Sequence, residues 1–209
     1  MSSSTRFRDP DVRACALAAF LLVAVAPLSP AVAQPAAANP AAAMNSATYI
    51  TRYVSDGRLA GEGRLTWLGF HVYDARLYAA ADFDVANPFA RPFVLELTYA
   101  RKLDGSGIAD ASRDEIERLG FGTEAQRGAW HKQMTALFPD VDKGRRIAGV
   151  YQPDSGARFY VDGSYAGAID EPEFARAFFS IWLDPRTRAP RLRESLLKGT
   201  GPSAGVANR

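Results

Sequence analysis

The two histidines of this 209-residue chain, His71 and His131, are the first side chains to test for catalytic or metal chemistry. Neither belongs to an HxxxH motif or to a histidine–carboxylate cluster of metal-binding spacing, and neither has a GxSxG turn beside it to supply a nucleophile. Asp140 and Asp142 offer too few ligands for a calcium loop. We therefore expect no catalytic residue, no metal and no cofactor.

Aromatic and aliphatic side chains are concentrated in the segment GRLTWLGFHVYDARLYA, residues 63–79. Taken as one long strand, bent or bulged at Gly69, this segment has two apolar faces. These faces hold Leu65, Trp67, His71, Tyr73 and Leu77 on one side and Leu68, Phe70, Val72 and Tyr78 on the other. Both faces need a cover, which is either a set of helices of the same chain or a bound ligand.

Further strands are predicted on both sides of a helical region. Residues 93–99 alternate as a half-buried strand that ends at Tyr99. Arg101 follows, and it lies either at the rim of a cleft or at a solvated strand end. Turn signals separate three later strands, at residues 146–153, 157–162 and 164–169.

Helix starts are predicted from their capping residues. Ser112 with Glu115, and Thr123 with Gln126, fit the capping box, and Asp170 is expected to cap a third, strongly apolar helix. A fourth helix is expected over residues 190–199. The third helix is expected to bury Phe178, Phe179, Ile181 and Trp182. The order of elements indicates an α+β fold in which helices lie on a large antiparallel sheet.

The N-terminal residues have the pattern of a secretory signal peptide, with Arg6, Arg8 and Arg13 before the apolar run 14–26. That run is shorter than the roughly 20 residues of a membrane-spanning helix, so no stable membrane span is expected after cleavage. The predicted divisions are a signal peptide at 1–33, a disordered leader at 34–45, one domain at 46–199 and a disordered tail at 200–209. The protein is therefore expected to be periplasmic or secreted.

The charge of the chain does not favour nucleic-acid binding. Its formal net charge is +2, and no basic block stands out after the predicted signal peptide. Cys15, the one cysteine, lies within that signal peptide. The mature protein is therefore expected to hold neither a disulfide nor a thiolate metal site.

Five segments, taken in order, resemble the chalcone isomerase-like proteins, and within them the bacterial exported branch. The segments are GEGRLTWLGFHVYDARLY (61–78), FVLELTYARKLDG (93–105), LFPDVDKG (137–144), GARFYVDGSYAGAIDEPEFARAFFSIWL (156–183) and LRESLLKG (192–199). The resemblance implies a large antiparallel sheet backed by helices, with a ligand cleft between them. Plant members close a flavanone ring, whereas related non-enzymatic members bind fatty acids or act as accessory proteins.

The same resemblance implies candidate ligand-binding residues. In the enzymes, a cleft arginine near the glycines that open this strand polarises the substrate, and in fatty-acid-binding relatives such an arginine binds a carboxylate. Leu65 takes the matching position here and Arg64 precedes it, so Arg64 faces the other side unless a bulge turns it inward. We expect this arginine clamp to be absent. Tyr73 lies near the position of a cleft hydroxyl, or else is a structural tyrosine.

The candidate ligand-binding residues are therefore Arg64, Tyr73, Tyr99 and Arg101. Three functions agree with the sequence. The preferred one is an exported, non-catalytic protein that binds an acyl chain or another hydrophobic small molecule in the cleft. The alternatives are an isomerase or lyase of the chalcone isomerase type, and an interaction module that binds no ligand.

We expect the mature protein to begin at or near Gln34, because Ala31 and Ala33 supply the small side chains that precede an export cleavage site. N-terminal sequencing of the protein from its host measures this directly. An intact Met1 in a cytoplasmic fraction would contradict the prediction.

Overall fold

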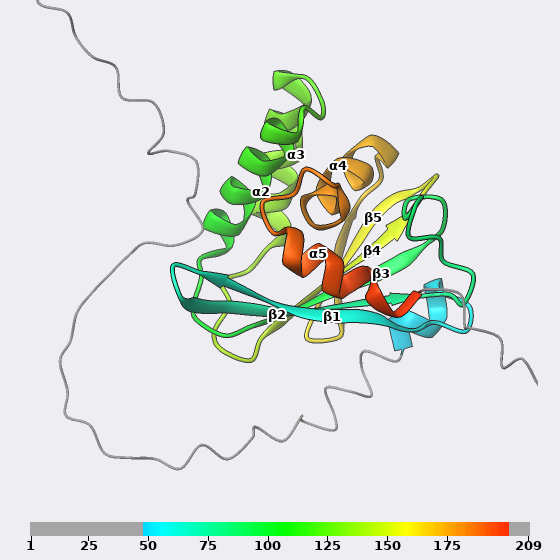
Figure 1. The fold of residues 1–209 in the computed structure, drawn as a ribbon. Helices are drawn as coiled ribbons and strands as arrows, with labels where there is room; N and C mark the ends of the chain where they lie inside the picture. Colours follow the sequence, from blue (N-terminus) through cyan, green and yellow to red (C-terminus); the bar gives the residue numbers. More distant parts are fainter. Residues whose placement is uncertain (1–47, 201–209) are drawn as a thin grey trace, which may run out of the picture.

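A six-stranded antiparallel sheet, with its strands in chain order, carries helices on one face (Figure 1). This computed structural model describes residues 48–200, so the predicted signal peptide, the leader and nearly all of the predicted tail lie outside it. The strands are β1 (Arg58–Trp67), β2 (Phe70–Ala79), β3 (Phe93–Tyr99), β4 (Arg146–Gln152), β5 (Gly156–Val161) and β6 (Ser164–Ile169). The helices are α2 (Gly105–Leu119), α3 (Glu124–Leu137), α4 (Pro172–Leu183), α5 (Pro190–Leu197) and the 3₁₀ turn η1 (Lys198–Thr200), after a helical segment at 48–53. The predicted α+β fold is confirmed.

The segment 63–79 forms two strands, so the prediction of one long strand was wrong. Trp67 ends β1 and pairs with Phe70, which begins β2. Leu68 and Gly69 connect them with φ angles of 48° and 81°, as a two-residue type I′ hairpin turn requires. Such turns usually contain Asn or Gly at the first position. A leucine there concealed the turn among apolar residues.

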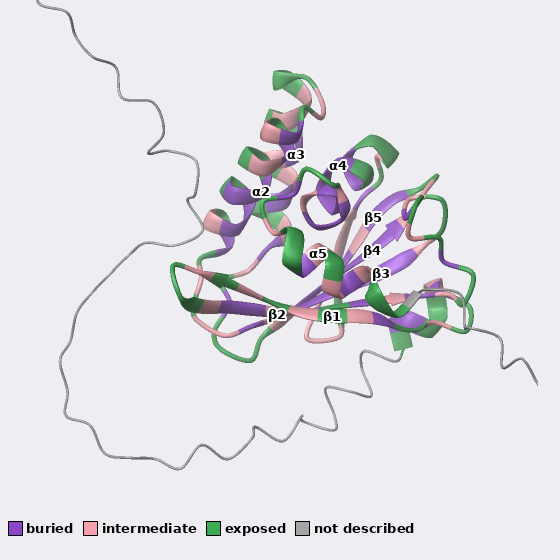
Figure 2. Cartoon of the chain, in the orientation of Figure 1, coloured by how far each residue is buried: buried purple, intermediate pink, exposed green. Residues whose placement is uncertain are grey.

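The main core lies between the sheet and the helices. As predicted, Phe93, Leu95, Leu97 and Tyr99 of β3 share one face and are buried in this core. Phe179 and Trp182 of α4 belong to the same cluster. Burial along β3 and β4 is nearly continuous, as the purple strands of Figure 2 show.

The opposite face of the sheet is also covered, which corrects the description of β3 as half-buried. The helical segment 48–53, which the sequence did not predict, lies on this face, where Tyr49 and Ile50 pack against Val94 and other residues of β3 to β5. Glu96 of β3 points to the same face and is only 2% exposed. Tyr49 donates a hydrogen bond to the Glu96 carboxylate, and Arg146 lies 3.4 Å from the same oxygen. These contacts compensate for the burial of the carboxylate.

The capping predictions had mixed outcomes. Thr123 and Gln126 form the predicted capping box of α3. Ser112 instead lies inside α2, where its hydroxyl donates to the carbonyl of the preceding turn, so it does not begin a helix. The N-cap of α4 is Glu171 and not Asp170, and no side chain caps this helix. Pro172 at the first helical position makes the cap less necessary, because it has no backbone N–H to satisfy.

Helix α5 packs directly on the backbone of β1. A Cβ atom at Gly61 would lie 2.2 Å from the carbonyl oxygen of Leu196, and one at Gly63 would lie 2.8 Å from the Cδ1 atom of Leu192. Only glycine leaves room for this approach. The two glycines therefore set the distance between α5 and the sheet.

Gly61→Ala is expected to destabilise the protein by about 1–3 kcal/mol, because the new methyl group overlaps the α5 backbone. Gly128 is a matched control, since it lies exposed within α3 and a methyl group added there would meet no other atom within 4 Å. Gly128→Ala is expected to stabilise the protein by about 0.5–1 kcal/mol through helix propensity. Urea unfolding measures both changes, and equal midpoints for the two variants would contradict the packing of α5 on β1.

Candidate functional site

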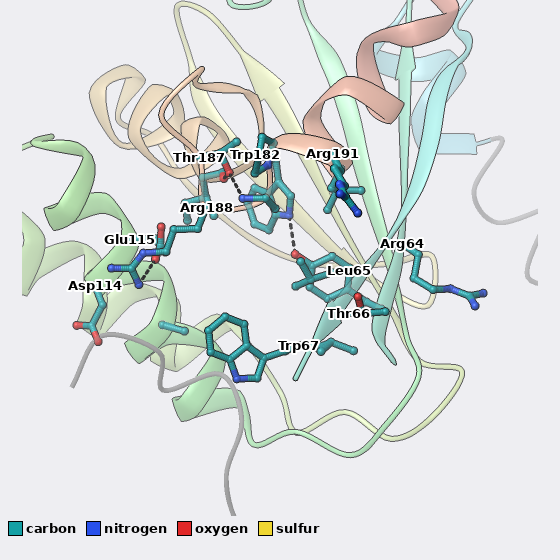
Figure 3. A pocket seen from close by; sticks show the side chains of 17 residues that line it. Arg64, Leu65, Thr66, Trp67, Asp114, Glu115, Trp182, Thr187, Arg188 and Arg191 are labelled. Atoms are coloured by element: carbon teal, nitrogen blue, oxygen red, sulfur yellow. Dashed lines mark hydrogen bonds and ion pairs between the residues drawn. The ribbon is translucent and has the colours of Figure 1, made fainter. Parts of the chain in front are cut away.

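A cleft of about 450 Å³ lies between the β1–β2 hairpin and the helices α2, α4 and α5 (Figure 3). This volume is within the range of about 300–1,000 Å³ that is common for small-molecule sites. The apolar part of its wall includes Leu65, Trp67, Val72, Tyr73, Ile181 and Trp182. The cleft therefore has walls from the β1–β2 hairpin on one side and from three helices on the other.

A hydrogen bond between two aromatic side chains crosses the inner end of the cleft. Trp182 of α4 donates from its Nε1 atom to the hydroxyl of Tyr73 on β2, at 2.9 Å, and both residues are buried. The Tyr73 ring also contacts Tyr99 edge to face. Burial raises the pKa values of the Tyr73 and Tyr99 phenols well above their usual range, so both phenols are neutral at physiological pH.

A smaller cavity of about 60 Å³ continues beyond this pair. It shares Tyr73, Ala111, Glu115, Ile181 and Trp182 with the cleft, and the rest of its lining is mainly apolar, including Phe138 and Phe178. The inner space is thus mainly apolar, and Glu115 lines both spaces.

Charged side chains surround the opening of the cleft. Glu115 of α2 forms an ion pair with Arg188 at 2.9 Å, which joins α2 to the segment between α4 and α5 (Figure 3). Glu115 forms a second ion pair, within α2, with Arg118 at 2.8 Å. Burial raises the pKa of the neighbouring Asp114 carboxyl. Arg191, in the first turn of α5, also lines the cleft, and within residues 48–200 its guanidinium has no ion-pair partner.

Arg64 and Leu65 face in opposite directions. Leu65 is half-buried in the cleft wall, whereas the guanidinium of Arg64 points away from the cleft and donates to Asp74 at 2.8 Å (Figure 3). A bulge is present, but it comes after Leu65, between the pairs Leu65↔Tyr73 and Thr66↔His71. It therefore does not turn Arg64 inward. Arg64 contributes to the lining of the cleft, but its guanidinium is turned to Asp74.

The other candidates are divided between the cleft and its surroundings. Tyr73 lines both spaces, and Tyr99 lines only the inner cavity. Arg101 lies beyond the end of β3, with its guanidinium 5.8 Å from the centre of the Phe70 ring, and does not line the cleft. The structure thus brings Tyr73 and Tyr99 together, includes Arg64 in the cleft lining with its guanidinium on Asp74, and leaves Arg101 outside the lining.

Sequence reasoning did not assign most of the residues that line the cleft, among them Trp67, Glu115, Trp182, Arg188 and Arg191. Trp182 was expected only in the core, and it is both a core residue and part of the cleft wall. A usable signal for the arginines was the segment DPRTRAPR, residues 184–191, in which prolines interrupt a cationic stretch directly after the most apolar helix.

The described residues contain no group of three or more His, Cys, Asp or Glu side chains that is able to hold a metal ion. His131 pairs with Asp110 at 2.6 Å, and His71 with Asp74 at 3.1 Å, away from the inner cavity. Within residues 48–200, no helix has both the length and the hydrophobicity needed to cross a membrane.

Comparison with known proteins agrees with this fold. The model of a family described as chalcone isomerase-like matches residues 52–198. An uncharacterized protein of Haemophilus influenzae is 29% identical over 140 residues, which cover 67% of each chain. The solved structure of a fatty-acid binding protein from Arabidopsis thaliana superimposes with a TM-score of 0.56 at 16% identity, covering 70% of this chain and 89% of that one. This structural likeness shows a common fold.

Trp182→Ala is expected to destabilise the protein by about 3–5 kcal/mol, the usual cost of removing a large buried aromatic side chain. Trp182→Phe is expected to cost less, because it keeps a ring in the core. Its remaining cost includes the loss of the hydrogen bond to Tyr73. Denaturant unfolding measures both values. An unchanged midpoint for Trp182→Ala would show that this side chain does not support the core.

Proposed function

The chain belongs to the chalcone isomerase-like family, and we propose that it is an exported, non-catalytic protein that binds a hydrophobic small molecule or an acyl chain in the cleft between the hairpin and the helices. The observation that carries the proposal is the open cleft of about 450 Å³ whose wall is mainly aromatic and aliphatic. An open apolar cleft argues against an interaction module with a filled core.

Apolar burial supplies enough free energy for such binding. At about 25 cal/mol per Å², a chain that buries roughly 300 Å² gains about 7 kcal/mol before the costs of association. The inner cavity beyond Tyr73 and Trp182 adds apolar wall in the direction in which an acyl chain would extend. The similar protein of Arabidopsis thaliana is named a fatty-acid binding protein, which supports an acyl ligand.

The polar end of the ligand has a suitable partner at the opening. Arg191 has no ion-pair partner within the described chain and lines the cleft from α5, and the Thr66 hydroxyl lines it from β1. A guanidinium binds a carboxylate through two parallel hydrogen bonds. Arg191 would thus supply, from the opposite wall of the cleft, the cation that related proteins carry on the strand at the position of Leu65.

The non-catalytic part of the proposal depends on Leu65. Ring closure of a chalcone develops negative charge that a preorganised cation must stabilise, a contribution of several kcal/mol. Leu65 occupies the strand position beside Tyr73 where that cation is expected, and Arg64 is paired with Asp74 on the outer side. Tyr73 retains a neutral hydroxyl that can bind a ligand, but Leu65, its neighbour across the strand pair, carries no charge.

Leu65→Glu is expected to weaken binding of long-chain fatty acids at least tenfold, because it places a carboxylate in the apolar wall, at a cost of about 1–3 kcal/mol or more. Leu59→Glu is the matched control, since Leu59 lies on the same strand, outside the cleft and 45% exposed. Displacement of a fluorescent fatty acid from the purified protein measures both affinities, and the control is expected to bind like the wild type.

Two results would overturn the proposed function. Chalcone cyclisation well above the solvent rate, abolished by Tyr73→Phe, would establish the isomerase alternative. Failure to bind any member of a panel of fatty acids and flavonoids, with no ligand retained in native mass spectrometry of the protein from its host, would establish the interaction module.

A further inference from the structure

The tip of the β1–β2 hairpin exposes two large apolar side chains. Leu68 is 79% exposed and Phe70 is 61% exposed, the highest values among the large hydrophobic residues in the described part of the chain. Trp67 precedes them and is half-buried. The hairpin tip, residues 67–70, therefore presents a small apolar surface to solvent.

Leu68 is unfavourable for the isolated protein in two ways. Its φ angle of 48° lies in the left-handed region, where a bulky side chain is rare and where Asn or Gly would form the same turn more readily. Its exposed side chain also gains no burial from the fold. Neither local conformation nor core packing explains a leucine at this position, so a contact outside the monomer is the remaining explanation.

Size and charge favour a lipid bilayer as that contact. A tip of four residues cannot supply the roughly 800 Å² that each partner buries in a stable protein interface. The guanidinium of Arg101 lies over the Phe70 ring, Lys102 beside it is exposed, and neither forms an ion pair within the described residues. Aromatic and aliphatic side chains next to such cations suit the interface of an anionic membrane, where the rings enter the headgroup layer and the cations meet phosphates.

The tip is continuous with the cleft. Trp67 belongs to the tip and also lines the cleft. We propose that residues 67–70 insert into the surface of an anionic bilayer, with Arg101 and Lys102 contacting the lipid headgroups. Insertion would hold the opening of the cleft at the membrane surface, where an apolar ligand passes between lipid and protein without crossing water.

Flotation of the purified protein with vesicles of phosphatidylcholine and phosphatidylglycerol tests this proposal. The wild type is expected to float with the vesicles, and Leu68→Asn is expected to lower the bound fraction about tenfold, since insertion strength follows buried apolar area. Because asparagine tolerates the left-handed turn, its thermal midpoint should be equal or higher, which separates loss of binding from unfolding. Leu59→Asn removes an exposed leucine at the opposite end of β1 and is expected to float like the wild type.

Two further measurements test the role of the cations and the position of the hairpin tip in the bilayer. Arg101→Gln is expected to reduce flotation with the anionic vesicles, and acyl chains that carry bromine are expected to quench the fluorescence of Trp67, a signal that Trp67→Phe removes. A wild type that stays with the soluble fraction, or a Leu68→Asn variant that floats equally well, would overturn the proposal. A wild-type dimer that Leu68→Asn converts to a monomer would also overturn it, in favour of a second copy of the chain. Each result is independent of whether a fatty acid binds in the cleft.

Discussion

The cleft depends on the close packing of α5 against β1. Gly61 and Gly63 have no side chains, so the backbone of α5 reaches the strand and Leu192 and Leu196 enter the core. This contact fixes one wall of the cleft and places Arg191 at its opening. Side chains at the two glycines would push α5 outward and change the width of the site, so the binding geometry is set by two residues that do not themselves bind a ligand.

The two faces of the sheet are covered by different elements. On the outer face, the helical segment 48–53 and the partners of Glu96 cover β3 and β4 and leave them buried on both sides. On the inner face, α4 packs on β4 and β5, α5 packs on β1 and β2, and α2 packs against α4, with the cleft between these three helices and the β1–β2 hairpin. The centre of the sheet is thus covered on both faces, whereas the β1–β2 hairpin at its edge carries the cleft wall and an exposed tip.

Local patterns in the sequence were sufficient for much of the fold. The alternation of residues 93–99 identified the buried face of β3, and the Thr123–Gln126 pair marked the start of α3, because both signals depend on neighbouring residues only. The hairpin turn at Leu68 and the cover over Glu96 were missed. An apolar residue in a turn has no local signature, and the helical segment that buries Glu96 is distant in sequence.

For the site, the sequence by itself determined that Arg64 and Leu65 face opposite sides, since adjacent side chains of a strand alternate. Only the tertiary structure decided which side is the cleft, because that depends on where α2, α4 and α5 pack. It also joined Tyr73 to Trp182, and Glu115 to Arg188, across long sequence separations. Periodicity describes one element at a time, whereas a cleft is made by several elements whose contacts are formed only on folding.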